Sequence, residues 1–157
     1  MNTFDLLKIL RLWGFRNAIV CPVDKLDLTT PGIYIVNTDC GAGRHWVVLY
    51  VTTDTVEFFD SFGNHPRFVQ NGSLFMAAIG TKKLIVHSKW VQETNSKLCG
   101  VYCLGFVYAR SKDKLSKFFA LFDDNRSMNN HKVFVIVNTL IKTTKMYITL
   151  FVLLFNN

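Results

Sequence analysis

The chain of 157 residues is half hydrophobic, contains four cysteines and has a formal net charge of +7 at pH 7. This length and hydrophobic content predict one domain with a core of its own, and neither a repeat nor a low-complexity linker divides it. Because no amino-terminal secretory signal is present, the cysteines argue against a secreted disulfide scaffold and for a reducing intracellular compartment.

The hydrophobic pattern predicts an α+β fold in which a mainly antiparallel sheet packs against one buried helix. Helices are expected at 3–13, 97–110, 114–122 and 129–141, and strands at 33–37, 45–52, 55–60 and 83–88. We expect one domain over 1–143, followed by an apolar tail at 144–157. The most apolar run of this tail, the ten residues 146–155, is shorter than the roughly 20 residues that span a bilayer. Packing on the domain, contact with a membrane and contact with another chain all stay open for it.

The strands expected at 45–52 and 55–60 are separated by residues 53–54, where a tight hairpin would turn. A two-residue loop there sets a register in which Asp60 shares a face with His45. The two residues are then diagonal neighbours within side-chain reach. A slip of one residue would move Asp60 to the other face, so the pairing depends on this turn.

Cys99 stands at the start of the helix expected at 97–110, behind a polar loop. The unpaired N–H groups and the positive end of the dipole at a helix N-terminus favour thiolate over thiol. Ser96 or Asn95 can serve as the N-cap. The run from Val101 onwards is apolar on every side, which predicts a helix buried inside the domain.

Four side chains therefore fit cysteine nucleophilic catalysis. Cys99 attacks, His45 takes and returns the proton, and Asp60 holds the imidazole. Gln92, seven residues before the cysteine, can donate a hydrogen bond to the developing oxyanion beside the Cys99 N–H. Each residue alone has a structural explanation, and only their order along one chain favours catalysis.

The chain resembles the adenovirus-type (adenain-like) cysteine endopeptidases, within the larger group that includes the deSUMOylating proteases. The resemblance covers about residues 3 to 125 and rests on four motifs in the right order. These are Tyr34-Ile35-Val36-Asn37-Thr38, His45-Trp46, Phe59-Asp60-Ser61-Phe62-Gly63, and Gln92 with Asn95, Ser96, Cys99, Gly100 and Cys103.

Two details favour the adenovirus-type branch. The deSUMOylating enzymes usually place the glutamine six residues before the cysteine and an aspartate directly before it. Here the spacing is seven and position 98 is Leu98. The Phe62-Gly63 pair is similar to the viral enzymes, although these often carry glutamate where this chain has Asp60.

The resemblance implies a papain-like fold and a monomeric thiol endopeptidase. Such an enzyme would mature precursor proteins of a virus or virus-like mobile element, and it would act in the virion and in the host nucleus or cytoplasm. It implies cleavage after small residues such as glycine, no cofactor for the chemistry itself, and DNA and a short viral peptide as activators. A membrane is not an expected partner. Candidates for the substrate cleft are Gly43, Arg44, Trp46, Asn95 and Gly100.

Positive charge is concentrated in the second half of the chain. Residues 1–80 carry six basic and seven acidic side chains, whereas residues 81–157 carry twelve and four. A basic face there would attract polyanions, although scattered solvated lysines explain the count equally well. The DNA-binding candidates are Lys82, Lys83, Lys89, Lys112, Lys114 and Lys117.

Two other functions stay open from sequence alone. One is an isopeptidase that acts on ubiquitin-like modifiers with the same catalytic residues. The other is a non-enzymatic DNA-binding or capsid-binding module that has kept the fold. No metal site is predicted, because Cys21 and Cys40 lack the close spacing of zinc ligands.

Overall fold

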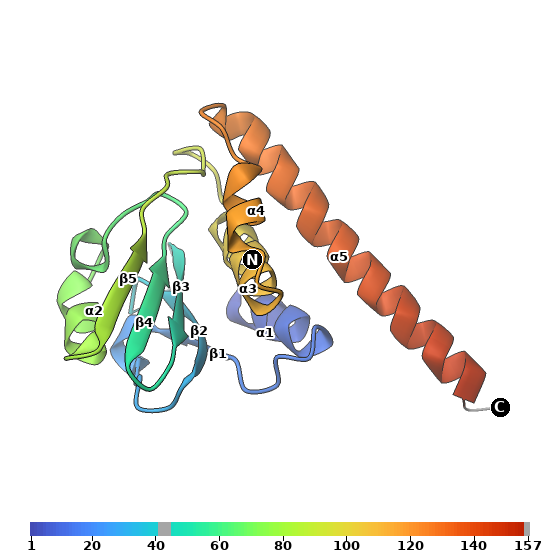
Figure 1. Cartoon of the computed structure of the whole chain (residues 1–157), viewed down its shortest axis with the longest axis horizontal. Coiled ribbons are helices and arrows are strands. Elements are labelled where there is room, and N and C mark those ends of the chain that lie inside the picture. The colour runs from blue at the N-terminus through green and yellow to red at the C-terminus, as the bar shows by residue number, and fades with distance from the viewer. Residues whose placement is uncertain (41–44, 156–157) are drawn as a thin grey trace.

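The computed structural model describes residues 1–40 and 45–155, which fold around a five-stranded sheet (Figure 1). The strands lie in chain order across the sheet, and their bounds are β1 Ile19–Pro22, β2 Gly32–Asn37, β3 Trp46–Val51, β4 Thr55–Phe59 and β5 Lys83–His87. The three central strands β2, β3 and β4 are antiparallel, whereas β1 pairs with β2 and β5 pairs with β4 in parallel. The sheet is therefore mixed, and the prediction of a mainly antiparallel sheet holds only for its centre.

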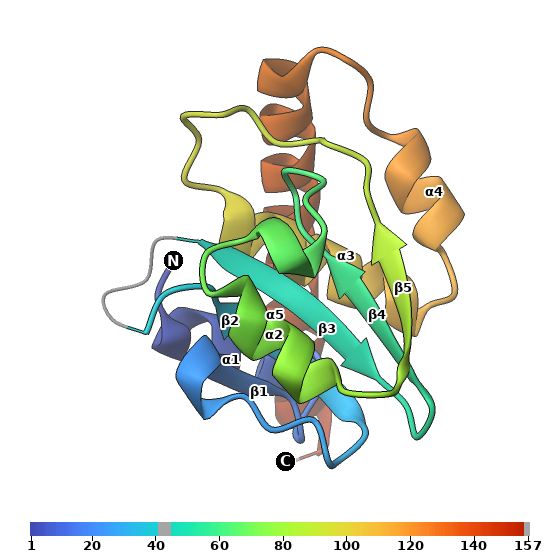
Figure 2. The ribbon, with the colours of Figure 1, turned by 90° about the vertical axis from the view of Figure 1, so that its left-hand side faces the viewer.

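Helices cover both faces of this sheet, which confirms the α+β class. Their bounds are α1 Thr3–Leu12, α2 Gly72–Ile79, α3 Cys99–Ser111, α4 Leu115–Ala120 and α5 Arg126–Phe155, with short 3₁₀ turns η1 Val23–Lys25 and η2 Pro66–Phe68. Helix α2 lies on one face, and α1, α3 and α4 lie on the other, with α5 outside them (Figures 1 and 2).

The sheet separates two hydrophobic cores, and β3 contributes to both. Trp46 and Val48 pack with α3 and α1, whereas Val47, Leu49 and Val51 pack with α2 on the opposite face. Alternate side chains of a strand point to opposite faces, so a strand with helices on both sides must be apolar throughout. This confirms the burial of this strand on both faces that the sequence predicts.

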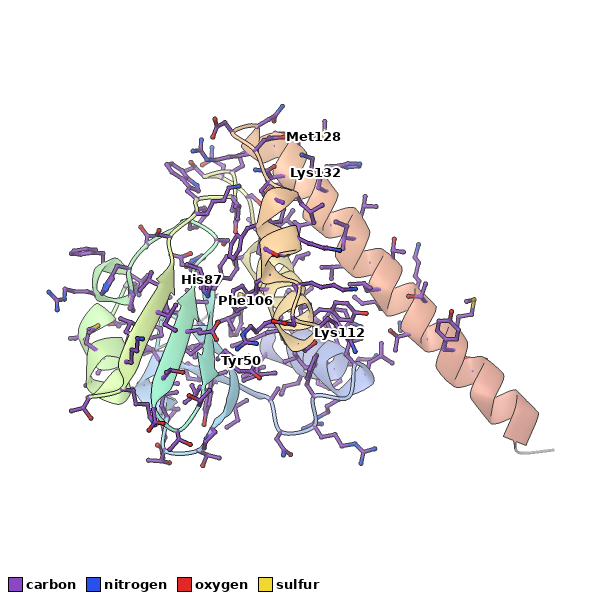
Figure 3. The ribbon with its side chains drawn as sticks, in the orientation of Figure 1. Tyr50, His87, Phe106, Lys112, Met128 and Lys132 are labelled. Atoms are coloured by element: carbon purple, nitrogen blue, oxygen red, sulfur yellow. The ribbon has the colours of Figure 1, made fainter. Side chains whose placement is uncertain are left out.

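Helix α3 is the buried helix that the sequence predicts, and its exposed end is tied to the sheet by an ion pair. Residues 99–107 are all buried. The Arg110 guanidinium donates to both carboxylate oxygens of Glu57 on β4, with Nε to Oε1 at 3.0 Å, and lies over the Tyr50 ring at 4.6 Å. Figure 3 shows Tyr50, His87 and Phe106 between the sheet and α3. Bidentate pairing of this kind fixes orientation as well as adding energy.

Two elements were missed from sequence, and one was predicted too short. β1 has only four residues and ends in a proline, and α2 begins at a glycine with no side-chain cap, so neither shows a clear signal. The last helix was expected at 129–141 but continues through the expected tail as the single helix α5 of 30 residues. Residue 144 lies inside that helix. Within the described residues, no helix is long and apolar enough to cross a membrane.

A tight turn follows β4 and requires a glycine. The Gly63 N–H donates to the Asp60 carbonyl at 2.8 Å, and Gly63 has φ +72°. A Cβ at this position would lie 2.5 Å from the Ser88 carbonyl oxygen and 2.9 Å from the Trp90 nitrogen. The segment after Asp60 therefore packs directly on the backbone that follows β5.

We expect Gly63→Ala to lower the free energy of unfolding by at least about 3 kcal/mol, because it adds a backbone clash to the cost of a positive φ. The matched control is Gly14→Ala. Gly14 also has positive φ, at +90°, but a Cβ there meets nothing within 4 Å. The control should lose only about 1 to 2 kcal/mol. Urea unfolding of both variants measures the difference, and equal losses would contradict the packing argument.

Candidate active site

The candidate site lies where the start of β3, the end of β4 and the start of α3 meet. Val48 pairs with Phe59, Val51 pairs with Val56, and the chain turns at residues 53–54. This is the register predicted from sequence. His45 directly precedes β3 and Asp60 directly follows β4, so the antiparallel pairing brings them together.

The imidazole of His45 is held directly by Asp60. His45 Nε2 and Asp60 Oδ1 lie 2.6 Å apart, and the Asp60 side chain is fully buried. The Phe62 N–H donates to Oδ1 at 2.9 Å, and Asn64 Nδ2 donates to Oδ2 at 2.8 Å. Both carboxylate oxygens therefore have hydrogen-bond partners, and the shorter aspartate reaches the histidine without a bridging water.

The ring of Phe62 adds a second restraint on His45. The two rings stack with centroids 4.9 Å apart and an interplanar angle of 29°. A hydrogen bond at Nε2 and a stacked ring together fix both the tautomer and the plane of an imidazole. Because Nε2 is bound to Asp60, Nδ1 is the ring nitrogen left to exchange a proton with a nucleophile.

The Cys99 thiol lies close enough to His45 and to the backbone N–H groups of Trp46 and Gly100 for all three to act on its pKa. Burial raises the pKa of this thiol, but the bond to His45, its positive charge and the two N–H donors outweigh burial, so the pKa is lowered. Burial lowers the pKa of His45, but bonds to Asp60 and Cys99 raise it to about 9. The opposite shifts both favour a thiolate–imidazolium pair, compared with the same two groups in isolation.

Gln92 is fully buried, and its amide is fixed in one orientation. The Ser61 hydroxyl donates to Gln92 Oε1 at 2.6 Å, and Gln92 Nε2 donates to the Ser96 carbonyl at 2.8 Å. Because a carbonyl can only accept, the atom that faces Ser96 must be the nitrogen. The nitrogen carries two N–H groups, so one remains beyond the bond to Ser96.

The loop that carries Gln92 is anchored from three directions. The N–H groups of Val91 and Gln92 both donate to the Ser61 carbonyl, at 2.9 and 3.0 Å. The Val91 carbonyl accepts from the Tyr102 hydroxyl on α3 at 3.1 Å and from Asn129 Nδ2 on α5 at 3.2 Å. Helices α3 and α5 therefore fix the position of this loop relative to Cys99.

The predicted N-cap of α3 is wrong. The cap residue is Leu98, which has no side-chain cap hydrogen bond, and the helix begins at Cys99. Ser96 instead accepts from the Leu98 N–H through its hydroxyl at 3.2 Å, and its carbonyl serves Gln92. Without a side-chain cap, the first N–H groups of α3 stay open toward the thiol.

Three of the five predicted cleft residues lie in the described part of the chain, and they differ in how they relate to the thiol. Trp46 and Gly100 flank the thiol through their backbones, but the Trp46 ring is buried and donates through Nε1 to the Met1 carbonyl at 3.2 Å. A Cβ on Gly100 would meet the Met1 side chain at 3.4 Å, so Met1 lies over the start of α3. Asn95 is exposed. Gly43 and Arg44 lie outside the described residues.

The six predicted DNA-binding lysines occupy different environments. Lys82 Nζ donates to backbone carbonyls of the β3–β4 hairpin, and Lys89 Nζ donates to the carbonyls of Phe119 and Phe122 at the end of α4. Lys83 is exposed on β5. The remaining three line one groove beside α4: Lys112, Lys114 and Lys117.

Sequence reasoning gave no role to Ser61, Phe62 or Asn64. All three lie within four residues after Asp60 and contact Gln92, His45 and Asp60 respectively. The available signal was their place in the short turn around Gly63. In the described part of the chain, no group of three His, Cys, Asp or Glu side chains is arranged to hold a metal ion.

A scan against models of protein families and a search of curated proteins found no match to this chain.

The paired pKa shifts predict how Cys99 reacts with iodoacetamide. Because the reactive species is the thiolate, we expect a midpoint below the value of about 8.5 of an ordinary cysteine. In His45→Ala the thiol stays buried but loses its cation, so the midpoint should rise above the ordinary value. Alkylation over a pH series, resolved by site with mass spectrometry, measures both midpoints.

Cys103 is the internal control for this experiment. It lies one turn further along α3, fully buried, and burial raises the pKa of its thiol well above the usual range. It should stay unlabelled in the folded protein wherever Cys99 reacts. Identical Cys99 profiles in wild type and His45→Ala would rule out the ion pair.

Proposed function

We propose that the protein is a cysteine endopeptidase of the adenain-like class, with the related papain-like fold, which processes precursor proteins of a virus or virus-like mobile element. The observation that carries this proposal is the Cys99 thiol at the start of α3, whose pKa is lowered by a histidine that Asp60 holds at 2.6 Å. The order of the four sequence motifs supports the narrower assignment. The same resemblance supports action in the virion and the host nucleus or cytoplasm.

The proposed chemistry is acyl transfer through the thiol. The Cys99 thiolate attacks the carbonyl carbon of the scissile bond, and the electron pair moves to the carbonyl oxygen. The open N–H of Cys99 and the free N–H of Gln92 stabilise that oxyanion. His45 donates its proton to the departing amine, and an acyl-enzyme forms.

Hydrolysis then restores the enzyme. His45, now neutral, accepts a proton from water as the water attacks the acyl carbonyl, and the thiolate leaves. Asp60 keeps Nδ1 of the ring directed at the reacting atoms and stabilises the imidazolium in both steps. No metal or organic cofactor takes part in this scheme. DNA and a short peptide belong to the proposal only as activators, by resemblance.

The proposed preference for glycine or another small residue has a physical basis at the nucleophile. Cys99 is only 7% exposed. Trp46 and Gly100 approach its sulfur with their backbones. A substrate carbonyl that reaches a thiol so enclosed must come from a residue with little side-chain volume, because a bulky group would clash with the walls.

A cleavage panel tests the proposal. We expect the protein to hydrolyse glycine-containing capsid-precursor peptides and to leave ubiquitin-like modifier fusions intact, with and without added DNA. Cys99→Ala and His45→Ala should abolish turnover, whereas Cys103→Ala should retain it. Cleavage of the modifier fusions alone would favour an isopeptidase. Salt-sensitive DNA binding without any cleavage, unchanged in Cys99→Ala, would favour a binding module.

The oxyanion assignment of Gln92 makes a separate prediction. Gln92→Ala should lower kcat by about 100-fold, since a lost oxyanion donor costs about 3 kcal/mol in the transition state. Ser61→Ala should lower kcat by about tenfold, because the amide loses the hydroxyl that orients it. Both variants should keep the wild-type pH profile of Cys99 alkylation. A changed profile would show that they disturb the nucleophile instead.

A further inference from the structure

An apolar groove lies between α3, α4 and the first half of α5, away from Cys99. It encloses a volume of about 230 Å³. Its apolar walls include Phe118, Leu121 and Phe122 from α4 and the residues after it, and Val133, Ile136 and Leu140 from α5. At the rim, Leu121 and Ile136 are 40% and 37% exposed. Large aliphatic side chains are therefore presented to solvent on both sides of one depression.

The floor of the groove depends on a glycine in α3. A Cβ on Gly105 would lie 2.9 Å from Cε2 of Phe118 and 3.5 Å from Cγ2 of Val133. The missing side chain lets α4 and α5 both pack closely on α3 at this point. From there α5 extends away from the body of the protein (Figure 1).

Three lysines border this groove, and no acidic residue lines it. Lys112, Lys114 and Lys117 come from the end of α3 and from α4. The ammonium of Lys112 lies 5.9 Å from the Tyr108 ring centre, on the side of α3 that faces α5 (Figure 3). Among the described residues, no carboxylate forms an ion pair with Lys114 or Lys117. Within the part of the chain that the structure describes, these two ammonium groups therefore have no carboxylate partner within 4.0 Å.

We propose that this groove binds an acidic amphipathic segment of a partner protein, whose apolar side chains enter the groove while its carboxylates meet the three lysines. Charge complementarity selects the sign of the partner, and the apolar lining selects a polypeptide. Duplex DNA would satisfy the lysines but has no apolar side chain to fill the space between Phe118 and Ile136. The site goes beyond the proposed protease activity and does not depend on it.

The test uses fluorescence anisotropy with a labelled helical peptide that carries leucines on one face and glutamates on the other. Three other labelled ligands are compared with it: the same peptide with serine for leucine, the same peptide with lysine for glutamate, and a DNA duplex. We expect saturable binding of the first peptide only. Lys114→Glu/Lys117→Glu should weaken it by at least about tenfold, and Leu121→Ser should also weaken it.

The matched control is Lys8→Glu/Lys83→Glu, which changes the net charge equally at two exposed positions outside the groove. It should leave peptide binding within about twofold of wild type. Thermal unfolding of each variant checks that it folds. Equal weakening by both double variants would overturn the site. Stronger binding of DNA, unaffected by Leu121→Ser, would assign the lysines to a polyanion surface instead. Analytical sedimentation checks whether the protein associates with itself. If self-association covers the groove and abolishes peptide binding, the proposal is overturned too.

Discussion

The candidate site depends on the register of one hairpin. β3 and β4 meet in the pairing of Val48 with Phe59, and this pairing alone brings the residue before β3 beside the residue after β4. Side chains alternate along a strand, so a shift of one residue would turn Asp60 away from His45 and move each buried side chain of β4 into the opposite core. Burial on both faces of the central strands therefore fixes the geometry of the histidine and carboxylate, before any catalytic interaction contributes.

The five residues after β4 combine most of the supporting contacts. Asp60 holds the imidazole, Ser61 holds both the backbone and the amide of Gln92, Phe62 stacks on His45, and Asn64 donates to the carboxylate. Gly63 lets this segment turn against the backbone after β5. Because one short segment orients both His45 and Gln92, a shift of the turn would disturb the two together.

Local signals predicted the parts of this structure that follow from side-chain alternation and short loops. The 53–54 turn, the buried helix and the pairing of His45 with Asp60 are of this kind. Predictions from sequence were wrong or missing where tertiary contacts decide the structure. Strand β1 forms by pairing with β2, and α5 continues past two lysines. Leu98, rather than Ser96, caps α3. The contacts of the lysines could not be predicted either. Lys89, for example, donates to the carbonyls of Phe119 and Phe122, which lie about 30 residues further along the chain.

The contact between Asn129 and the Val91 carbonyl has a consequence for the order in which the protein is made. This bond, at 3.2 Å, joins the start of α5 to the loop beside the nucleophile. On the ribosome, Cys99 and His45 leave the exit tunnel well before Asn129 does. During that interval the Gln92 loop lacks one of its supports, so His45 and Asp60 can come together before this loop is held in place. A nascent chain therefore completes this arrangement only once the start of α5 has emerged.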